Sequence, residues 1–341
     1  MIQIEETITS KIIFHRISSE ENKCIFSNSL FDSSDDNEES VFKKIFLKPF
    51  LSHSLTFEFK HEVDMDYNIL FNLSKAIYEG GDFIEKSKDI SQHLISVSKH
   101  PHIKDGDFFV VKFDDIKLNN ESYEGVGLYK FEDKESYIDT SVDNKEAAIK
   151  FRKGIGSRKP DKACLIIFAQ EPYTLFIIDN NSNETEYWQN DFIKHKAKND
   201  FINNTSNFLT LTKDFITAQI PTEYDVSKAD QIDLLNRSVE YFKTHETFDK
   251  TEFEEEVFHH TTIIDSFRKF DETYRHENDM ELSDNFEISE QAVKKQARVF
   301  KRVLKLDKNF HIYIHGNREL IEQGVDENGR KFYKIYYEEE S

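Results

Sequence analysis

The spacing of apolar residues in the N-terminal half predicts helices packed against a sheet. Residues 8–17 alternate between two sets of side chains, which is typical of a strand with one buried face. Residues 67–78 and 82–99 are predicted helices, and Gly80-Gly81 between them favours a helix end. In the second helix, the residues that share one stripe are Phe83, Ser87, Ile90, Leu94 and Val97.

Past His100-Pro101 the pattern changes to short apolar runs bounded by polar residues. The runs 108–113, 126–131, 164–169 and 175–178 predict strands. The segments between them are mostly too short or too polar for crossover helices, so the strands are expected to pair mainly antiparallel. We therefore expect an α+β fold, with helices packed on an antiparallel sheet.

The C-terminal half is predicted to be mostly helical. A helix is expected over 227–244, another opens at a Thr-x-x-Glu capping box that begins at Thr251, and a third covers 289–304 with Ser289 as its N-cap. The segments 310–314 and 331–337 are expected to pair as a β-hairpin at the end of the chain.

A polar, Asn-rich stretch separates the two patterns. It covers residues 179–184, with the sequence DNNSNE. A chain of 341 residues is long enough for two ordinary domains of roughly 100–200 residues each. We expect an α+β domain over 1–180 and a helical domain over 181–341, which contains a basic helix and the final hairpin.

The composition predicts a folded, acidic protein. Hydrophobic residues make up 38% of the chain and include 31 Phe, which is enough to bury a core. The 65 Asp and Glu outnumber the 45 Lys and Arg, so the net charge is −20. No apolar run approaches the roughly 18 residues of a membrane helix. Cys24 and Cys164 cannot form a disulfide framework, and no secretory signal is recognised, so we expect a reduced, cytoplasmic protein.

Residues 145–162 contradict the acidic average, because they hold seven basic residues against two acidic ones. Gly154 and Gly156 lie among the basic residues, and glycine lets a backbone approach a phosphate group closely. The segment is either a solvated basic loop or a contact to DNA phosphates. The candidate DNA-binding residues here are Lys150, Arg152, Lys153, Arg158, Lys159 and Lys162.

A second basic segment, residues 289–308, also holds seven basic residues against two acidic ones. On a helix, Val293, Ala297, Phe300 and Leu304 would form one apolar face and leave the cations on the remaining arc. Such a helix could lie along phosphates, or its lysines could pair with acidic neighbours. The candidate DNA-binding residues here are Lys294, Lys295, Arg298, Lys301, Arg302 and Lys305.

The sequence does not contain a complete catalytic motif. The tripeptides 58–60 and 132–134 match the Glu-x-Lys half of a metal-dependent nuclease site, but no Pro-Asp partner precedes either at a convincing spacing. His259-His260 and His311 with His315 do not complete a zinc ligand set. We therefore expect a protein that is not an enzyme and that needs neither a cofactor nor a metal ion.

Five segments, in this order, carry a family resemblance. They are HPHIKDGDFFVVKF (100–113), GVGLYKFE (125–132), RKGIGSRKPDKACLIIF (152–168), YWQNDF (187–192) and FEISEQAVKKQARVFKRVLKLDKNFHIYIHGN (286–317). Together they resemble the bacterial nucleoid-associated protein family, the YejK-like group, over nearly the whole chain. The resemblance implies a cytoplasmic protein that is found with the chromosome and binds double-stranded DNA. It supplies no catalytic residue and no element that reads bases.

These observations predict a nucleoid-associated protein that binds double-stranded DNA non-specifically through its phosphates. The alternative is a non-catalytic adaptor whose basic helix docks a protein partner at the nucleoid. No membrane contact is expected. A homodimer is compatible with the sequence, which leaves the oligomeric state open.

Overall fold

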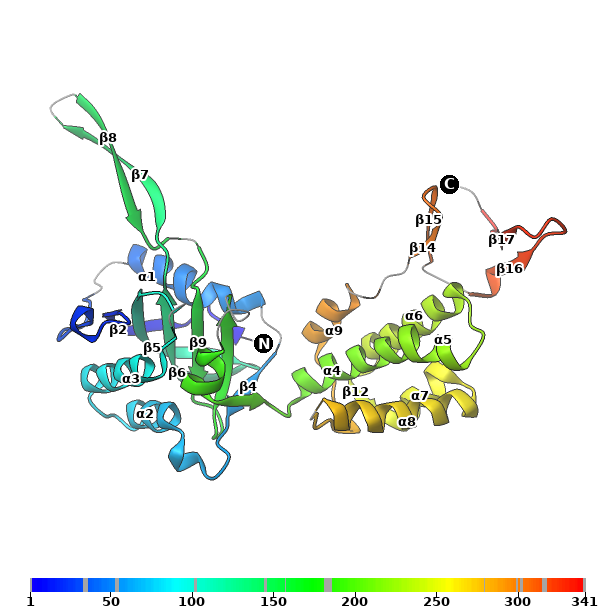
Figure 1. Ribbon diagram of the computed structural model, residues 1–341, viewed down its shortest axis with the longest axis horizontal. Coiled ribbons are helices and arrows are strands. Elements are labelled where there is room, and N and C mark those ends of the chain that lie inside the picture. The colour runs from blue at the N-terminus through cyan, green and yellow to red at the C-terminus, as the bar shows by residue number, and fades with distance from the viewer. Residues whose placement is uncertain are drawn as a thin grey trace. The chain divides into compact units, whose positions relative to one another are not determined.

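The apolar runs of the N-terminal half form the middle of an antiparallel sheet, as predicted. The structure is a computed structural model, and it divides into two units, Met1–Lys198 and Asn199–Ser341 (Figure 1). It describes residues 2–32, 36–52, 55–100, 103–143, 146–156, 158–180, 186–278, 280–298, 300, 303–314 and 318–339.

The main sheet of the N-terminal unit has the strand order β11-β4-β10-β9-β6-β5-β2-β3, and β1 pairs with β5. Neighbouring strands pair antiparallel throughout. A tight turn at Asn119-Asn120, where both residues have positive φ, joins the two longest strands. The strands are β1 (Ile2–Gln3), β2 (Ile8–Ile17), β3 (Ile25–Phe26), β4 (Phe57–Phe59), β5 (Gly106–Leu118), β6 (Glu121–Phe131), β9 (Lys162–Ile167), β10 (Thr174–Asp179) and β11 (His195–Ala197).

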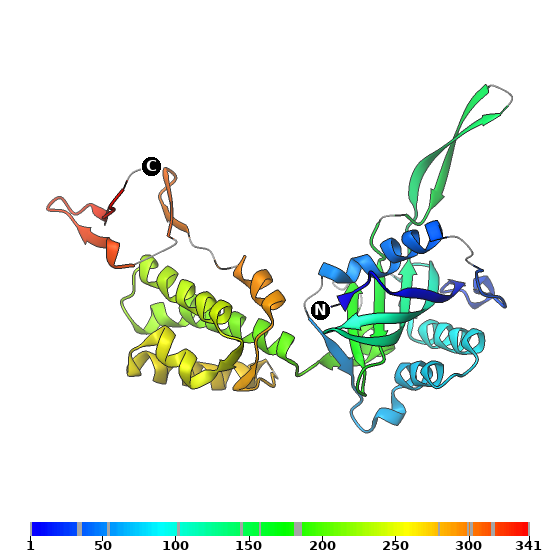
Figure 2. The same cartoon turned by 180° about the vertical axis from the view of Figure 1, so that it is seen from behind.

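Helices cover both faces of this sheet, which explains why β9 is buried along its whole length. Cys164 and Ile166 face the core under α2 (Ile69–Tyr78) and α3 (Phe83–Val97). Leu165 and Ile167 face the opposite core, which packs under the helical turns after α1 (Asp36–Phe42). Figure 2 shows α1 and its neighbouring turns from the other side of the sheet.

The N-terminal unit extends past the boundary expected at residue 180. Residues 181–185 lie outside the described residues, and the chain then forms a π-helical turn over Trp188–Ile193. The rings of Trp188 and Phe192 are buried in the core beneath α2 and α3. Strand β11 then pairs with β4, so these residues fold with the sheet rather than with the helices that follow.

The C-terminal unit is mainly helical and closes around an aromatic core. The ring of Phe208 lies 4.3 Å from that of Phe248 and 5.5 Å from that of Phe253, measured between ring centroids. The elements are α4 (Phe201–Asp214), α5 (Ile220–Glu223), α6 (Lys228–Thr244), β12 (Thr247–Asp249), α7 (Lys250–Phe258), α8 (Thr261–Glu277), β13 (Asn285–Glu287), α9 (Glu290–Ala297), β14 (Val303–Leu306), β15 (Phe310–Tyr313), β16 (Ile321–Val325) and β17 (Lys331–Ile335).

The structure of this unit differs from three local predictions. The helix after Ser289 ends at Ala297, because the chain from Val303 onward pairs with β15 as a strand. The last hairpin consists of β16 and β17, whereas β15 pairs with β14. The capping box at Thr251 is wrong, since Asp249 is the N-cap of α7 and accepts from the backbone N–H of Thr251.

His15 on β2 makes the stability of the N-terminal unit sensitive to acid. Its ring is fully buried, and burial lowers its pKa from 6.5 to about 4. The backbone N–H of Ser27 donates to Nδ1 at 3.2 Å, so Nε2 carries the proton and donates to Ser87 Oγ at 3.0 Å. A proton added to Nδ1 would therefore break the bond with Ser27.

We expect the free energy of unfolding to fall as the pH drops from 6.5 to 4, because the unfolded chain takes up a proton at His15 that the folded chain excludes. The loss attributable to His15 is about 3 kcal/mol over that range. Urea unfolding at several pH values checks this. The His15→Gln variant cannot titrate and should show a shallower pH dependence than wild type, whereas equal slopes would contradict the role of His15.

Candidate nucleic-acid interface

The first basic segment lies on a two-stranded hairpin that stands apart from the main sheet (Figure 1). Its strands are β7 (Glu135–Asp143) and β8 (Glu146–Gly154), and residues 135–154 are called the arm from here on. Lys150, Arg152 and Lys153 are exposed on β8. From Glu146 to Gly154, therefore, the segment is a strand rather than the loop expected from its sequence.

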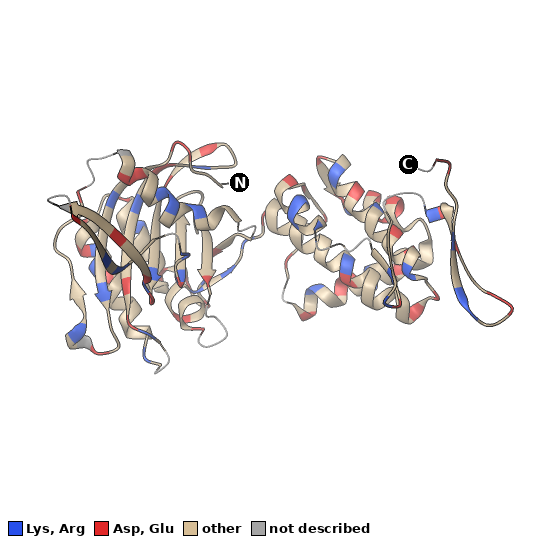
Figure 3. Ribbon diagram, turned by 90° about the horizontal axis from the view of Figure 1, so that it is seen from above, with Lys and Arg blue, Asp and Glu red and all other residues tan. Residues whose placement is uncertain are grey.

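The pairing register of the arm sets acidic residues against these cations. Asp139 lies directly opposite Lys150, and the Arg152 Nε donates to the Asp139 carboxylate at 2.7 Å. Residues 135–154 contain four basic and four acidic residues. Figure 3 shows both signs of charge along the described part of the arm. The arm is thus close to neutral and is not the strongly positive surface that residues 145–162 suggest by themselves.

Beyond the arm, the remaining cations of the first segment have different surroundings. Arg158 Nη2 lies 2.8 Å from an Asp161 carboxylate oxygen, and Lys159 is exposed. The Lys162 side chain is only 1% exposed, and its Nζ lies 2.6 Å from Asp179 Oδ1. Because its ammonium group cannot reach the surface, the structure removes Lys162 from the candidate DNA contacts.

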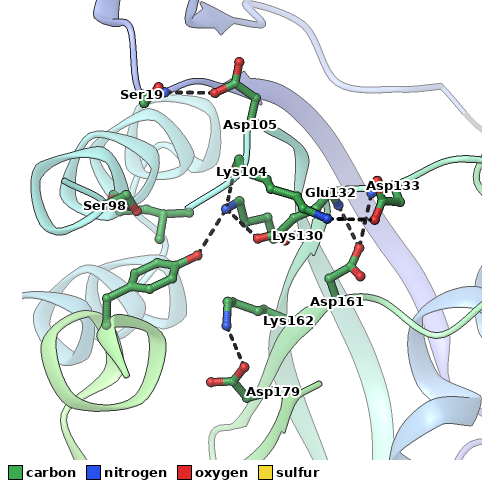
Figure 4. Close-up of polar contacts among 12 residues, drawn as sticks. Ser19, Ser98, Lys104, Asp105, Lys130, Glu132, Asp133, Asp161, Lys162 and Asp179 are labelled. Atoms are coloured by element: carbon green, nitrogen blue, oxygen red, sulfur yellow. Dashed lines mark hydrogen bonds and ion pairs between the residues drawn. The ribbon is translucent and has the colours of Figure 1, made fainter. Parts of the chain in front are cut away.

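Lys162 belongs to a buried polar cluster at one end of β6, β9 and β10 (Figure 4). A second lysine in this cluster, Lys130, is fully buried, and burial lowers its pKa. Its Nζ donates to the Lys104 carbonyl at 2.7 Å, to Glu132 at 2.9 Å and to the Tyr187 hydroxyl at 3.1 Å. These three partners use all three donors of the ammonium group, so the cluster is a closed structural network.

The two Glu-x-Lys tripeptides do not form a common site. Glu132 contacts Lys130 in the buried cluster, and Lys134 pairs with Asp107 at 2.6 Å. Glu58 lies on β4 and pairs with Lys196 at 3.3 Å. Strands β10 and β9 separate β4 from β6, which corresponds to about 14 Å across the sheet. Carboxylates this far apart cannot share a metal ion.

One group of the described residues could hold a metal ion. His245, Glu252 and Glu256 place their ligand atoms within 4.8 Å of one another. The Tyr241 hydroxyl donates to Glu252 at 3.0 Å, and the His245 Nε2 lies 3.8 Å from Glu256 Oε1. These contacts already account for the positions of the three side chains, so the arrangement does not require a ligand.

The second basic segment begins on α9, which presents its cations outward. Ala292 and Val293 are buried, whereas Lys294, Lys295 and Arg298 are exposed. This is the division that the helical spacing predicts. The remaining candidate cations are Lys305, which is exposed on β14, and Lys301 and Arg302, which lie outside the described residues.

Helix α9 is held in place by polar contacts to α4. The backbone N–H of Ser289 donates to Thr205 Oγ1 at 3.0 Å, and Gln296 Nε2 donates to Ser206 Oγ at 2.8 Å. Both contacts lie on the side of α9 away from its cations, and they fix the direction in which the cations project. Lys294, Lys295, Arg298 and Lys305 are called the C-terminal basic surface from here on.

A comparison with protein families identifies the chain. The family model described as "Nucleoid-associated protein YejK" matches residues 13–340. The chain belongs to this family. The resemblance seen in the sequence is thus confirmed. Neither the curated proteins nor the solved structures gave a significant match. Within the described part of the chain, no helix is long and apolar enough to cross a membrane.

For a nucleoid-associated protein, the two basic segments differ in how freely they could bind a polyanion. In the first segment, the cations of the arm are balanced by an equal number of acidic residues, Arg158 contacts the buried Asp161 carboxylate, and Lys162 is itself buried. In the second, Lys294 contacts Glu290 at 3.3 Å, with both side chains more than three-quarters exposed. Exposed pairs of this kind contribute little and are easily exchanged. The C-terminal basic surface is therefore the better candidate.

Proposed function

We propose that this nucleoid-associated protein binds double-stranded DNA without sequence preference, through the C-terminal basic surface. The observation that carries the proposal is the division of α9 into a buried apolar side and an exposed side with Lys294, Lys295 and Arg298. The lysines act as point charges toward phosphates, and Arg298 can donate two parallel hydrogen bonds.

The rigidity of α9 favours binding. Its packing on α4 and α6 holds the backbone in place before DNA arrives. Fewer groups must then be ordered on binding, and each ordered backbone residue would cost roughly 1–2 kcal/mol. The whole chain carries −20, so the rest of the molecule is more negative still; it repels DNA and would orient the molecule with the basic surface toward the polyanion.

The exposed cations of the first segment have a secondary role in this proposal. Lys150, Arg152, Lys153, Arg158 and Lys159 can add contacts, but their acidic neighbours reduce what each contributes. The protein acts as a non-enzymatic component of the nucleoid in the cytoplasm, and it needs no cofactor. A protein partner at the nucleoid is the alternative occupant of the same basic surface.

A salt series tests the mode of binding. We expect affinity to be insensitive to DNA sequence and to fall steeply as salt rises, because bound phosphates release counterions. About five phosphate contacts give a slope of log K against log salt near −4 to −5. Fluorescence anisotropy with several unrelated duplexes measures both properties. Strong preference for one sequence, or binding unchanged between low and high salt, would contradict the proposal.

A further inference from the structure

The arm has one polar face and one apolar face. Residues directly opposite each other in an antiparallel pair lie on the same face. Ile138 pairs with Phe151, Thr140 with Ile149, and Val142 with Ala147. The other face carries Tyr137, Asp139, Lys150 and Arg152. The name apolar face is used below for Ile138, Val142, Ala147, Ile149 and Phe151.

The large side chains of the apolar face are open to solvent. Ile138 is 58% exposed, Val142 79%, Ile149 67% and Phe151 81%. Figures 1 and 2 both show the arm extending away from the sheet and helices of the N-terminal unit. An isolated two-stranded hairpin is at best marginally stable in water and normally needs packing on one face. The arm therefore presents a surface that a binding partner would stabilise.

We propose that the apolar face is covered by the same face of a second copy of the chain. The four exposed side chains present about 500 Å² of apolar surface, since a large side chain offers on the order of 150–200 Å². Two such faces together bury about 1,000 Å², which is the lower limit for a specific protein interface. If fully buried, two arms supply the area of a weak interface, and the same patch on both copies satisfies two-fold symmetry.

The charges of the arm favour a second arm over DNA as the occupant. Equal numbers of acidic and basic residues keep two arms from repelling each other, although the whole chain carries −20. Lys153, opposite Ser136, lies on the same side as the apolar face but at the base of the arm, whereas Glu146 lies on the other face.

The dimer would join two C-terminal basic surfaces in one particle. If these surfaces bind DNA as proposed above, the dimer can hold two DNA segments at once. Self-association itself does not depend on the proposed function, because it involves a different surface of the chain.

Sedimentation velocity of the full chain tests the proposal. Wild type is expected to change from monomer to dimer across roughly 1–100 µM, the range suited to an interface of this size. The variant Ile149→Ser/Phe151→Ser should remain monomeric over the same range. The matched control is Lys150→Ser/Arg152→Ser, which changes the opposite face of the same strand and should dimerise like wild type.

Two results would overturn the proposal: a wild type that stays monomeric at every concentration, or an apolar-face variant that dimerises as wild type does. Circular dichroism and melting temperature should match among all three proteins, because the altered side chains lie outside the cores. If wild type is monomeric and the apolar-face variant binds DNA more weakly, the arm contacts DNA and the dimer proposal is wrong.

Discussion

Reversing the outward charges of α9 with Lys294→Glu, Lys295→Glu and Arg298→Glu is expected to weaken DNA binding about 100-fold or more. Each lost charge-assisted contact costs roughly 1.5 kcal/mol or more, and three of them add to more than two factors of ten. The three side chains are exposed, so the fold should survive. Fluorescence anisotropy with one duplex at one salt concentration measures the change.

The matched control reverses three exposed cations of the first segment with Lys150→Glu, Arg152→Glu and Lys159→Glu. Its charge change is the same, but we expect less than about a tenfold effect, because Asp139 already neutralises part of this surface. A larger loss in this control than in the α9 variant would show that the arm is the main contact. If the α9 variant binds DNA like wild type, that surface would be better explained as a docking site for an acidic protein partner.

Removing one partner of the buried Lys162–Asp179 pair is expected to destabilise the N-terminal unit by about 3–5 kcal/mol. The pair is 2.6 Å apart, with both side chains at most 2% exposed. In Asp179→Ala, the Lys162 ammonium group would remain buried without its carboxylate. Urea unfolding of the full chain, followed by circular dichroism, measures the free energy of unfolding.

Two further variants test whether the loss of stability comes from leaving Lys162 unpaired in the core or simply from removing a charged side chain. The double variant Lys162→Met/Asp179→Leu should be much less destabilised than Asp179→Ala, because neither charge remains to be desolvated. Glu85→Ala removes the exposed partner of the half-buried Lys88 on α3, which keeps access to water, and should cost less than about 1 kcal/mol. A loss in Asp179→Ala as small as that in Glu85→Ala would show that Lys162 finds another partner or water.

The strand β9 shows both what its sequence could predict and what it could not. The apolar run 164–169 predicts a strand, which the structure places at Lys162–Ile167, and its burial on both faces follows from helices on each side of the sheet. Lys162 at its start was expected at the surface, because lysine is rarely buried without a partner. That partner, Asp179, comes from the next strand, and only the pairing of β9 with β10 brings the two together.

The arm illustrates how register decides the electrostatics of a surface. A count along residues 145–162 gives a strong positive charge, but the acidic residues that compensate it lie on the preceding strand. Asp139 meets Arg152 only in the observed register. A sequence gives few signs of register when both faces of a hairpin are exposed, since no buried face fixes it.

For the second basic segment, the sequence predicts which side chains are buried and which are exposed better than it predicts the secondary structure. Leu304 is buried and Lys305 exposed, as expected for a helix continuing past Ala297. The strand β14 gives the same two orientations, because alternate residues of a strand point to opposite sides. Over so few residues, the repeat of a helix and the repeat of a strand predict the same buried and exposed positions. Only the pairing with β15 shows that this segment is a strand.

The salt dependence of the α9 variant, compared with that of wild type, tests the central claim most directly. If Lys294, Lys295 and Arg298 each neutralise one phosphate, the triple reversal removes three contacts. The slope of log K against log salt should then become less negative by about 2.7, at roughly 0.9 per contact. A variant whose slope equals that of wild type would contradict the account, because its phosphate contacts would then lie elsewhere on the chain.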